Sequence, residues 1–444
     1  ELIMSEIVAY QCSVPVRHDV DVFVAGGGPA GVAAALVAAR EGRSVFLAEG
    51  HSCFGGMGTA ALVPVFMTFS DGENFLADGI GREILDGLSA EKGEDSPLSR
   101  NSIPAELLKR VYDRLVCAAG ISFSFHTQVI DVRASDGHLD LAICNAKSGM
   151  FAVRAKMFVD GTGDGDLAAW GGAPFEKGDE AGNLMPGTLC SLWTDVDVEA
   201  AMASRGKVHD LLAQAFEDGH FTVKDPHHPG MFPVGNHVTG GNIGHAFGID
   251  STDERSLTEF YVSMRAMIPE FESFYRKYVP GYENIELVAT GSMMGIRESR
   301  RILGDYVLDV DDFKNRAVFE DEIGRYCYPV DIHPSRPDPK AYAAFEKEFR
   351  STLRYGKGES YGIPYRTLTP RGMDNLLVTG RCVSTDRQVQ GSIRVMPGCY
   401  ITGQAAGMAA AIAIERGVDT RGFAMGELLN RLQDIGAFLP NFSG

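Results

Sequence analysis

The stretch Val22-Phe23-Val24-Ala25-Gly26-Gly27-Gly28-Pro29-Ala30-Gly31 decides the fold of this chain. Its apolar start is typical of a buried parallel strand, which runs into the pattern Gly26-x-Gly28-x-x-Gly31. An Ala-rich helix is expected from Val32 to Arg40, and a second strand from Ser44 to Ala48. Within about 30 residues this is the strand–turn–helix–strand order of a dinucleotide-binding βαβ unit.

Each residue of this turn has an expected purpose. Gly26 permits the tight turn, Gly28 leaves room for a pyrophosphate, and Gly31 lets the helix pack closely on the strand. The helix N-terminus, at Pro29 and Ala30, offers backbone N–H groups and a positive dipole end to phosphates. Glu49 follows the second strand, where a carboxylate can accept both ribose hydroxyls. The alternative is a glycine-rich loop in an ordinary α/β fold.

The bulk properties exclude several classes of protein. A length of 444 residues suggests two or three domains. A net charge of −18 argues against nucleic acid and anionic membranes as partners. Eight cysteines without a CxxC pair fit a reducing compartment and give no metal-ligand spacing, so no metal is expected. No run is long enough to span a membrane. We therefore expect a cytoplasmic protein, with a processed leader left open because the chain begins at Glu1.

A meander and further helices are expected after the βαβ unit. Residues 1–17 are expected to form a lead-in strand or arm. Lys147-Ser148-Gly149 joins two alternating runs and indicates an antiparallel hairpin inserted into the parallel fold. The expected helices are 75–88 and 103–119, with Pro104 at the first helical position, and the expected strands are 123–127, 128–133, 139–144 and 151–154.

A second glycine turn, Asp160-Gly161-Thr162-Gly163-Asp164-Gly165-Asp166, follows another apolar strand. Two such turns on one chain suit a ligand larger than a mononucleotide. Contact with that ligand is expected at Gly161 and Asp164. The alternative for Asp164 and Asp166 is capping of the helix that begins near Leu167.

The strand–helix rhythm stops between about 174 and 282, which indicates a cap-like second domain with helices near 198–218 and 256–278. Its loop 235–245 is rich in glycine and carries His237 and His245, which can line a pocket or simply lie on the surface. His227-His228 lies in a turn flanked by prolines and is expected on the surface.

Two charged segments are candidates for chemistry. Gly295-Ile296-Arg297-Glu298-Ser299-Arg300-Arg301 could bind a carboxylate or phosphate, or form a structural ion-pair cluster. Asp331 and His333 would share one face of an extended segment, as a carboxylate–imidazole pair suited to proton transfer. The alternative is a surface pair without chemistry.

The C-terminal part returns to the first fold. A strand is expected at 375–381, and a small-residue helix from Thr402 to Ala411. The expected fold class is α/β, a Rossmann-like domain with an inserted antiparallel meander and a second α+β cap or substrate domain. The expected domain segments are 15–173, 371–418 and the return segment 291–310 for the Rossmann-like part, 174–290 and 311–370 for the cap, and 419–444 as a tail.

Six motifs occur in order along the chain: Gly26–Gly31 with Glu49, 160–166, 295–301, 328–333, 375–381 and Gly391-Ser392-Ile393-Arg394-Val395-Met396-Pro397. Together they resemble the FAD-dependent oxidoreductase family with a glutathione-reductase-like fold. More distantly the chain resembles succinate dehydrogenase and fumarate reductase flavoproteins. The first resemblance implies FAD as the cofactor. The second implies a substrate-supporting role for Arg394. With only one full Gly-x-Gly-x-x-Gly, a pyridine-nucleotide disulfide reductase is not expected.

We expect FAD to lie extended, with the N-terminus of the Gly403 helix near the flavin ring. The residues expected to contact FAD are Gly26, Gly28, Pro29, Ala30, Gly31, Glu49, Gly56, Met57, Val129, Gly161, Asp164, Gly380, Arg381, Gly403, Gln404 and Ala405.

The expected reaction is hydride transfer between a small hydroxylated or carboxylated substrate and flavin N5. The expected base is His333, oriented by Asp331, with His245 or His237 as the second choice, and Arg297 and Arg394 would hold the substrate. Alternatives are reduction of C=C or C=O, as in fumarate reductases, and a flavin-binding protein without turnover. The electron acceptor is not identified, and a homo-oligomer stays open.

Overall fold

A seven-stranded sheet forms the centre of the computed structural model, which describes residues 8–228 and 230–443. Its strand order is β3-β2-β1-β6-β5-β4, with β15 also paired to β6. The parallel strands are β1 (Val16–Ala25), β2 (Val45–Ala48), β3 (Ser122–Ser124), β6 (Gly149–Asp160) and β15 (Leu376–Val378). The antiparallel meander adds β4 (Gln128–Ser135) and β5 (His138–Ala146), joined to β6 through the expected hairpin.

Strand β6 belongs to both parts of the sheet. Its first half pairs antiparallel with β5, and its last residues, Phe158 to Asp160, pair parallel with β15. On its other side β6 pairs with β1. The sequence suggested two strands here, at 151–154 and 156–160, but they form one continuous strand, because no residue between them interrupts the pairing.

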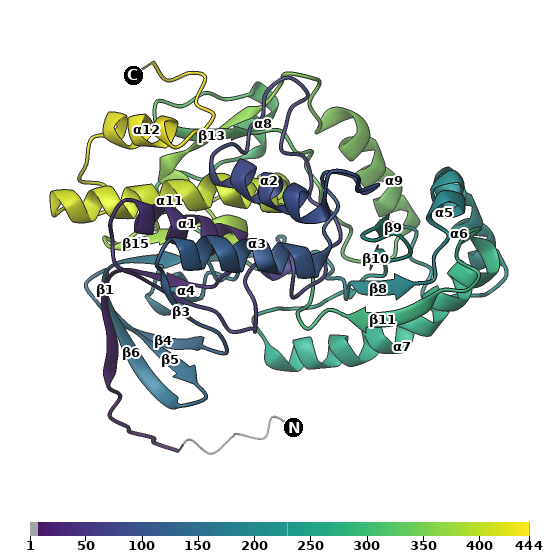
Figure 1. Ribbon diagram of the computed structural model, residues 1–444, viewed down its shortest axis with the longest axis horizontal. Helices are drawn as coiled ribbons and strands as arrows, with labels where there is room; N and C mark the ends of the chain where they lie inside the picture. The colour runs from purple at the N-terminus through teal and green to yellow at the C-terminus, as the bar shows by residue number, and fades with distance from the viewer. Residues whose placement is uncertain (1–7, 229, 444) are drawn as a thin grey trace.

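Both faces of the sheet are buried, as the apolar run 22–25 predicted. Val22 and Val24 point to a core built with α1 (Pro29–Arg40), α2 (Ile80–Lys92), α3 (Ala105–Ala118), α11 (Met396–Arg416) and α12 (Met425–Asp434). Phe23 and Ala25 point to a second core, with the meander and α4 (Asp166–Trp170). Figure 1 shows α1, α3 and α11 running across the middle of the molecule above the meander.

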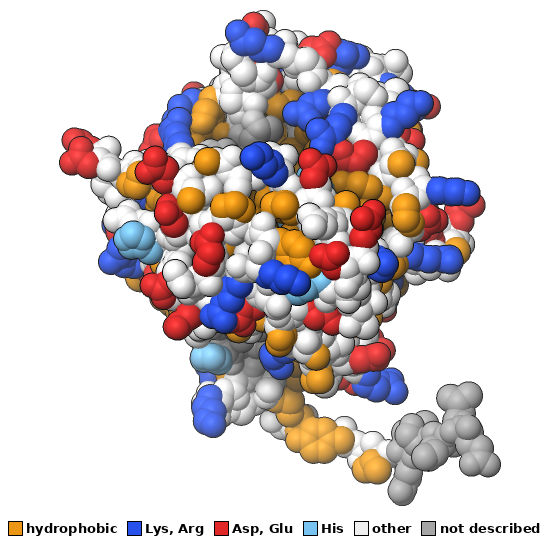
Figure 2. All heavy atoms as spheres, turned by 90° about the vertical axis from the view of Figure 1, so that its right-hand side faces the viewer, with side chains coloured by type: hydrophobic (Ala, Val, Ile, Leu, Met, Phe, Trp, Pro, Cys, Tyr) orange, Lys and Arg blue, Asp and Glu red, His pale blue; other side chains and the backbone are white. Residues whose placement is uncertain are grey.

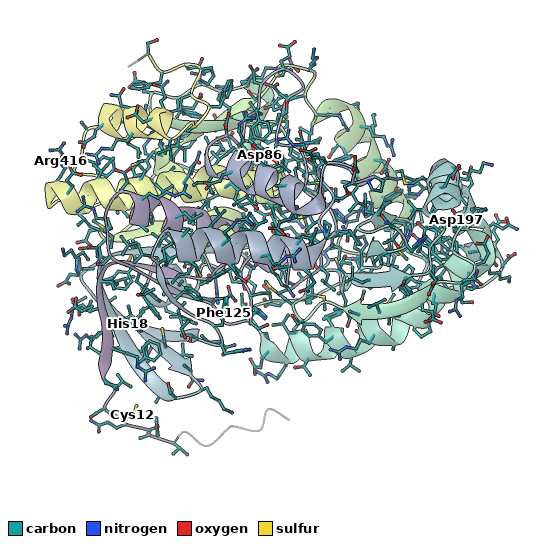
Figure 3. All side chains as sticks on the ribbon, viewed as in Figure 1. Cys12, His18, Asp86, Phe125, Asp197 and Arg416 are labelled. Carbon is teal, nitrogen blue, oxygen red and sulfur yellow. The ribbon has the colours of Figure 1, made fainter. Side chains whose placement is uncertain are left out.

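A four-stranded antiparallel sheet forms the cap, with order β11-β8-β10-β9. Its own core surrounds Trp193 and Phe274. Asp197 is the N-cap of helix α5 (Val198–Ser204) in the cap, and it lies far from Arg416 of α11 (Figure 3). The cap strands are β8 (Ser191–Thr194), β9 (Gly230–Pro233), β10 (Thr239–Asn242) and β11 (Glu286–Thr290), and its helices are α5 (Val198–Ser204), α6 (Val208–Glu217) and α7 (Glu254–Tyr278).

The segment from 311 to 370 packs differently from the expected grouping. Its hydrophobic residues, among them Phe313, Ile323 and Tyr361, join the core of α1 and α11 and not the core of the cap sheet. This segment contains α8 (Val310–Asn315), β13 (Glu322–Tyr326), α9 (Pro339–Lys347) and β14 (Tyr361–Pro364), and nearby elements are β7 (Phe175–Lys177), β12 (Arg300–Ile302) and α10 (Arg387–Ile393).

Several expected boundaries were wrong. The helix over 198–218 is broken into α5 and α6 by a short 3-10 turn at Arg205–Lys207. Helix α2 begins at Ile80 instead of 75, and Pro104 is the N-cap of α3 instead of its first residue. Residues 8–15 form no regular element before β1, and residues 1–7 of the expected arm lie outside the described part.

The described helices include none that is long and apolar enough to cross a bilayer. On the face that carries the cap, Lys and Arg side chains alternate with Asp and Glu (Figure 2). This face therefore has no large patch of one charge, although the whole chain is acidic.

Candidate active site

The nucleotide cradle, residues Gly26 to Gly31, is shaped by what surrounds each glycine. Gly26 has φ +90°, and a Cβ there would lie 2.6 Å from the carbonyl oxygen of Gly161. A Cβ on Gly31 would clash with the carbonyl oxygen of Gly26. Gly28 differs, because a Cβ there would meet no described atom within 4 Å. The turn is therefore tightly packed at both ends and open in the middle, where α1 begins after its N-cap Gly28.

The carboxylate of Glu49 is fixed at the end of β2. It is buried, with Oε2 accepting from the N–H of Gly27 (2.7 Å) and Oε1 from the N–H of His51 (2.7 Å). Val129 lies close by, two residues after Thr127, whose N–H donates to the carbonyl of Glu49 (3.0 Å). The acid is thus bonded to the cradle and oriented before any ligand binds.

Two further expected residues, Gly56 and Gly380, border the start of α1. A Cβ on Gly56 would lie 3.4 Å from Gly28 Cα, and a Cβ on Gly380 would lie 3.0 Å from the Cβ of Ala30. Met57 follows Gly56 in a 3-10 turn and is half-buried. Gly161 packs directly on the cradle, because its N–H donates to the carbonyl of Ala25 (2.8 Å).

The helix N-terminus expected at Gly403 was misplaced. Helix α11 begins at Met396, after its N-cap Val395, so Gly403 lies inside it. A Cβ on Gly403 would clash with the carbonyl oxygen of Ala30, which shows that this glycine lets α11 pack against α1. Gln404 Oε1 accepts from the N–H of Ile80 (3.1 Å), and Ala405 is fully buried. These residues join helices; the available N-terminus of α11 lies directly after Arg394.

The side chain of Arg381 joins the second glycine turn to the segment that carries Arg297. Its Nε donates to the carbonyl of Gly163 (2.8 Å) and its Nη1 to the carbonyl of Ile296 (2.8 Å). Its Nη2 forms a salt bridge with Asp164 (2.7 Å). Helix α4 begins after Gly165 without a side-chain cap, so neither Asp164 nor Asp166 caps it as the alternative suggested.

Most of the charged segment 295–301 is an ion-pair cluster. Glu298 is buried and accepts from Arg301 (2.8 Å) and Arg387 (3.0 Å). Arg300 pairs with Asp166 (2.7 Å). Arg297 differs from its neighbours, because it has no carboxylate at salt-bridge distance within the described residues. It is buried, and its Nη1 donates to the carbonyl of Pro186 (2.8 Å) and to Thr188 Oγ1 (2.9 Å).

Asp331, His333 and Arg394 meet as one buried group. His333 Nε2 lies 3.2 Å from Asp331 Oδ1, and Arg394 Nη2 donates to Asp331 Oδ2 (3.1 Å). The hydroxyl of Tyr328 also donates to this carboxylate, at 3.3 Å. Arg394 is the C-cap of α10, so a helix end and an irregular segment bring the three side chains together.

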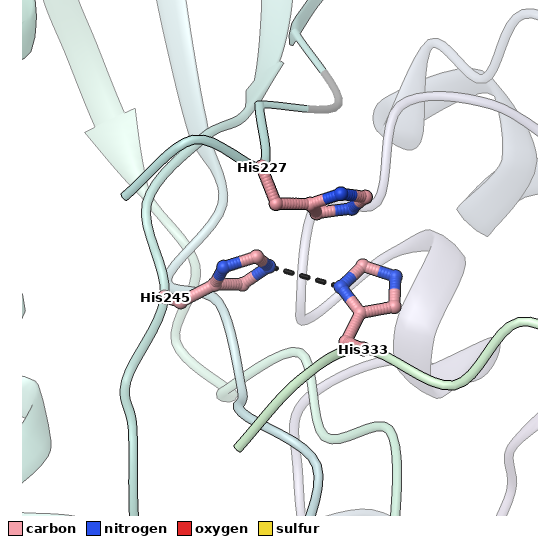
Figure 4. Close-up of side chains that lie close together, drawn as sticks. All are labelled: His227, His245 and His333. Atoms are coloured by element: carbon pink, nitrogen blue, oxygen red, sulfur yellow. Dashed lines mark hydrogen bonds between the residues drawn. The ribbon is translucent and has the colours of Figure 1, made fainter. Parts of the chain in front are cut away.

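The cap adds a second and third histidine. His245 Nε2 lies 3.0 Å from His333 Nδ1, the contact dashed in Figure 4. His245 Nδ1 lies 2.7 Å from Asp225 Oδ2, although the angle departs from that of a linear hydrogen bond. The ring of His227 stacks on His245, with centroids 5.1 Å apart, and meets His333 edge-on at 4.2 Å. We call His227, His245 and His333 the histidine cluster.

The family model described as FAD dependent oxidoreductase matches residues 21–433, from the cradle past Arg394. This chain belongs to that family. It is an enzyme whose cofactor is FAD. The structure fits such a cofactor, because the cradle is open at Gly28, where a pyrophosphate needs room, and carries an oriented acid at Glu49.

Individual relatives of this FAD-dependent oxidoreductase are distant. Thiamine thiazole synthase from Methanococcus aeolicus is 30% identical over 190 residues, which are 40% of this chain and 66% of that relative, just under two thirds. A geranylgeranyl bacteriochlorophyll reductase-like protein from Thermoplasma acidophilum is 14% identical, with a TM-score of 0.46 over 94% of this chain and 83% of its own. L-proline dehydrogenase from P. horikoshii is 10% identical, with a TM-score of 0.42 over 91% and 95%.

Burial decides the electrostatics of the oxidoreductase's histidine cluster. It lowers the pKa of His333 well below its usual value, and the positive charge of Arg297 adds to this effect. Burial also lowers the pKa of His245, against the opposing pull of Asp225. Burial and the charge of Arg394 lower the pKa of Arg297 to about 10. Both imidazoles that face each other are therefore neutral near pH 7.

His227 and His228 were expected on the surface, and His237 was expected as a possible base. His227 and His228 do not lie on the surface: His228 is buried and hydrogen-bonded to the Tyr275 hydroxyl, and His227 belongs to the cluster. His237 is exposed in the turn between β9 and β10, so the structure does not bring it to His245 and His333.

Sequence reasoning missed Asp225, His227 and Tyr328. Only the density of ionisable residues in Asp225-Pro226-His227-His228 could have indicated the first two, and only the nearness of Asp331 in sequence could have indicated Tyr328. Their position depends on how the cap folds back over the segment at 331–333, and no local pattern records that contact.

Proposed function

We propose that this oxidoreductase takes a hydride from a small hydroxylated or carboxylated compound and passes it to N5 of FAD. The observation that supports this proposal is the group formed by the buried residues Arg297, Asp331, His333 and His245 with the partly buried Arg394. Separate segments of the chain supply it, and Arg381 links it to the glycine turns.

In this proposal the cradle would hold FAD. Residues Gly26 to Gly31 would bind the pyrophosphate through the N-terminus of α1, and Glu49 would accept the ribose hydroxyls. Gly56, Met57 and Gly380 border the same place, and Asp164 with Arg381 lies between it and the substrate group. When bound, FAD supplies the hydride acceptor.

The two arginines would bind the polar end of the substrate. Arg297 has no carboxylate partner among the described residues, and Arg394 Nε is buried without a hydrogen bond there. A buried cation without a counter-charge is costly, so a substrate carboxylate would stabilise Arg297, and it could also accept from the free Nε of Arg394, whose Nη2 already pairs with Asp331.

The imidazole of His333 would receive the proton of the substrate. Asp331 faces Nε2 and so holds the N–H on that nitrogen, which leaves Nδ1 as a hydrogen-bond acceptor. As long as no metal ion occupies this place, the proton that leaves the substrate hydroxyl would bind to His333 Nδ1 and be shared with His245 Nε2. Closure of the cap over this group would keep water away from it.

The test is anaerobic bleaching of the purified, FAD-containing enzyme with a panel of hydroxy acids, polyols and amino acids. We expect at least one hydroxylated acid to bleach the flavin, and His333→Ala to slow that bleaching about 10²- to 10⁴-fold while FAD stays bound. His209→Ala, an exposed change on α6, is the matched control. An unchanged rate in His333→Ala would remove His333 from the scheme. Reoxidation of the photoreduced enzyme by unsaturated acids, without bleaching by any compound, would contradict the proposed direction.

We also propose a cytoplasmic location. All eight cysteines are free thiols, and six of them are buried, which is typical of a protein from a reducing compartment. Fractionation of source cells with the flavin-bleaching assay would test this, and activity confined to an oxidising compartment would contradict it.

A further inference from the structure

The two nitrogens that face each other in the histidine cluster lie 3.0 Å apart, and each ring has a carboxylate near its other nitrogen. A neutral imidazole has one N–H, and a carboxylate only accepts. Asp225 lies 2.7 Å from His245 Nδ1, off the line of a good hydrogen bond, and Asp331 lies 3.2 Å from His333 Nε2, so both carboxylates favour an N–H on the nitrogen that they face. In those tautomers two lone pairs point at each other across 3.0 Å, from His245 Nε2 and His333 Nδ1. A cation between them would remove this repulsion.

A proton between His245 and His333 would account for this pair alone. It leaves His227 unexplained. The Nδ1 of His227 is buried, and within the described residues it has no hydrogen-bond partner. One nitrogen from each of the three rings lies within 4.8 Å of the other two.

We propose that the histidine cluster binds one divalent transition-metal ion through His227, His245 and His333. This inference rests on the proposed substrate site, because it assigns an ion to the same place. Nitrogens bound at about 2.0–2.1 Å to one metal lie roughly 3.0–3.4 Å apart at the usual angles. The separation of His245 Nε2 and His333 Nδ1 already has this value, and a rotation of His227 would bring the third nitrogen in.

The carboxylates support the same assignment. Metal-bound histidines usually donate their other N–H to a carboxylate, which fixes the tautomer and the ring. Asp225 and Asp331 have this position behind His245 and His333. Their two negative charges also offset the cation, although Arg297 and Arg394 lie nearby and oppose it. Imidazole ligands favour zinc, iron, copper or nickel over magnesium or calcium.

Three protein ligands leave coordination positions free for an oxygen atom. The substrate class that fits is a hydroxylated carboxylic acid, with its hydroxyl oxygen on the ion and its carboxylate on Arg297 and Arg394. With the ion bound, His333 Nδ1 is a ligand and cannot also hold the proton. The ion and the shared proton therefore cannot lie between His245 and His333 at the same time.

The experiment uses the FAD-containing enzyme, first stripped with a chelator and then dialysed against cobalt(II). We expect one cobalt ion per chain, measured by elemental analysis, and absorption bands of nitrogen-bound cobalt at wavelengths beyond the flavin band. His227→Gln and His245→Ala should weaken cobalt binding at least 100-fold, and Asp225→Asn about 10- to 100-fold. His209→Ala should bind cobalt like the unchanged protein. The flavin spectrum and circular dichroism of each variant show whether it is folded.

Two results would overturn the metal site: no cobalt bound by the folded holoenzyme, or binding that His227→Gln and His245→Ala leave unchanged. The proposed function fails differently. Bleaching by a hydroxylated acid in an enzyme that binds no cobalt would contradict the metal site and leave the function standing. Stoichiometric cobalt with no bleaching by any hydroxylated acid would contradict the function and leave the metal site standing.

Discussion

The nucleotide cradle and the histidine cluster are built in opposite ways. The cradle is local: consecutive residues from Gly26 to Gly31 form it, and its shape comes from backbone and missing side chains. The cluster is assembled from side chains of the cap and the segment at 331–333, and Arg394 at the end of α10 reaches it through Asp331. The first depends on close packing within one turn, and the second on how distant segments meet. Substitutions in each region should therefore have different effects on stability and on FAD or substrate binding.

The largest effect is expected inside the cradle. In Gly31→Ala the new Cβ would clash with the carbonyl oxygen of Gly26, so the turn has to open, at a cost of about 3–5 kcal/mol in unfolding free energy. In Gly28→Ala the Cβ enters open space, and φ −70° suits alanine, so stability should change by less than about 1 kcal/mol. Its FAD affinity should nevertheless fall, because the Cβ occupies the place expected for the pyrophosphate.

Chemical denaturation and flavin fluorescence of the two variants measure stability and affinity separately. Equal loss of stability in Gly28→Ala and Gly31→Ala would show that the middle of the turn is not open, and unchanged FAD affinity in Gly28→Ala would show that it is not a ligand site.

The link between the two regions comes next. Arg381→Met removes three hydrogen bonds and leaves the carboxylate of Asp164 without its buried cation, so the unfolding free energy should fall by about 3 kcal/mol. Arg300→Met breaks a single salt bridge to Asp166 in the same neighbourhood and should cost about 1 kcal/mol. Thermal denaturation of both variants gives the comparison. Equal costs would mean that Arg381 does not join the regions.

A smaller effect is expected at the substrate end. Arg394→Gln should leave folding and FAD content intact but lower kcat/KM for the bleaching substrate about 10- to 100-fold, the size of one lost charged hydrogen bond. Arg416→Gln, on the exposed end of α11, is the control (Figure 3). Wild-type kinetics in Arg394→Gln would exclude this arginine from substrate binding.

The smallest effect is a pH dependence in the second glycine turn. Burial and the charges of Asp164 and Asp160 raise the pKa of Asp166 to about 6, against the pull of Arg300. The folded state thus holds this proton more tightly than the unfolded state, and the unfolding free energy falls as the pH rises from about 4 to 6. The side chain is 29% exposed, so we expect solvent to reduce the loss to about 1 kcal/mol.

Asp166→Asn stays neutral at every pH, and should exceed wild-type stability at pH 8 but match it at pH 4. Asp210→Asn, on exposed α6, should show no such difference. Denaturation curves at both pH values test this, and parallel curves for Asp166→Asn and wild type would contradict it.

The cradle could be derived from sequence because its determinants are adjacent. The apolar alternation of Val22 to Ala25, the glycine spacing and the acid at Glu49 each have one local cause, and the structure places strand, turn and helix accordingly. The second glycine turn was also visible, but its direct contact with the cradle at Gly161 was not, since that contact joins separate segments.

The proposed substrate site could be derived only in pieces. Asp331 and His333 are close in sequence and do touch. Their contact with His245, and the entry of Asp225 and His227, required the cap to fold over them. His237 shares a glycine-rich loop with His245, but it stands in an exposed turn while His245 follows a buried strand. Helix α11 was misplaced because small residues such as Gly403 mark close packing as well as helix ends.

Helix α11 packs on α1 so closely that Gly403 and Gly407 leave no space for a methyl group against Ala30 and Ala34. During translation, the nascent cradle leaves the ribosome long before this helix has been synthesised. Until then, the face of α1 that packs on α11 has no partner, although β1 can already pair with β2 and β6. We therefore expect stable FAD capture late in biosynthesis, and a ribosome stalled before α11 should yield a chain that stays colourless.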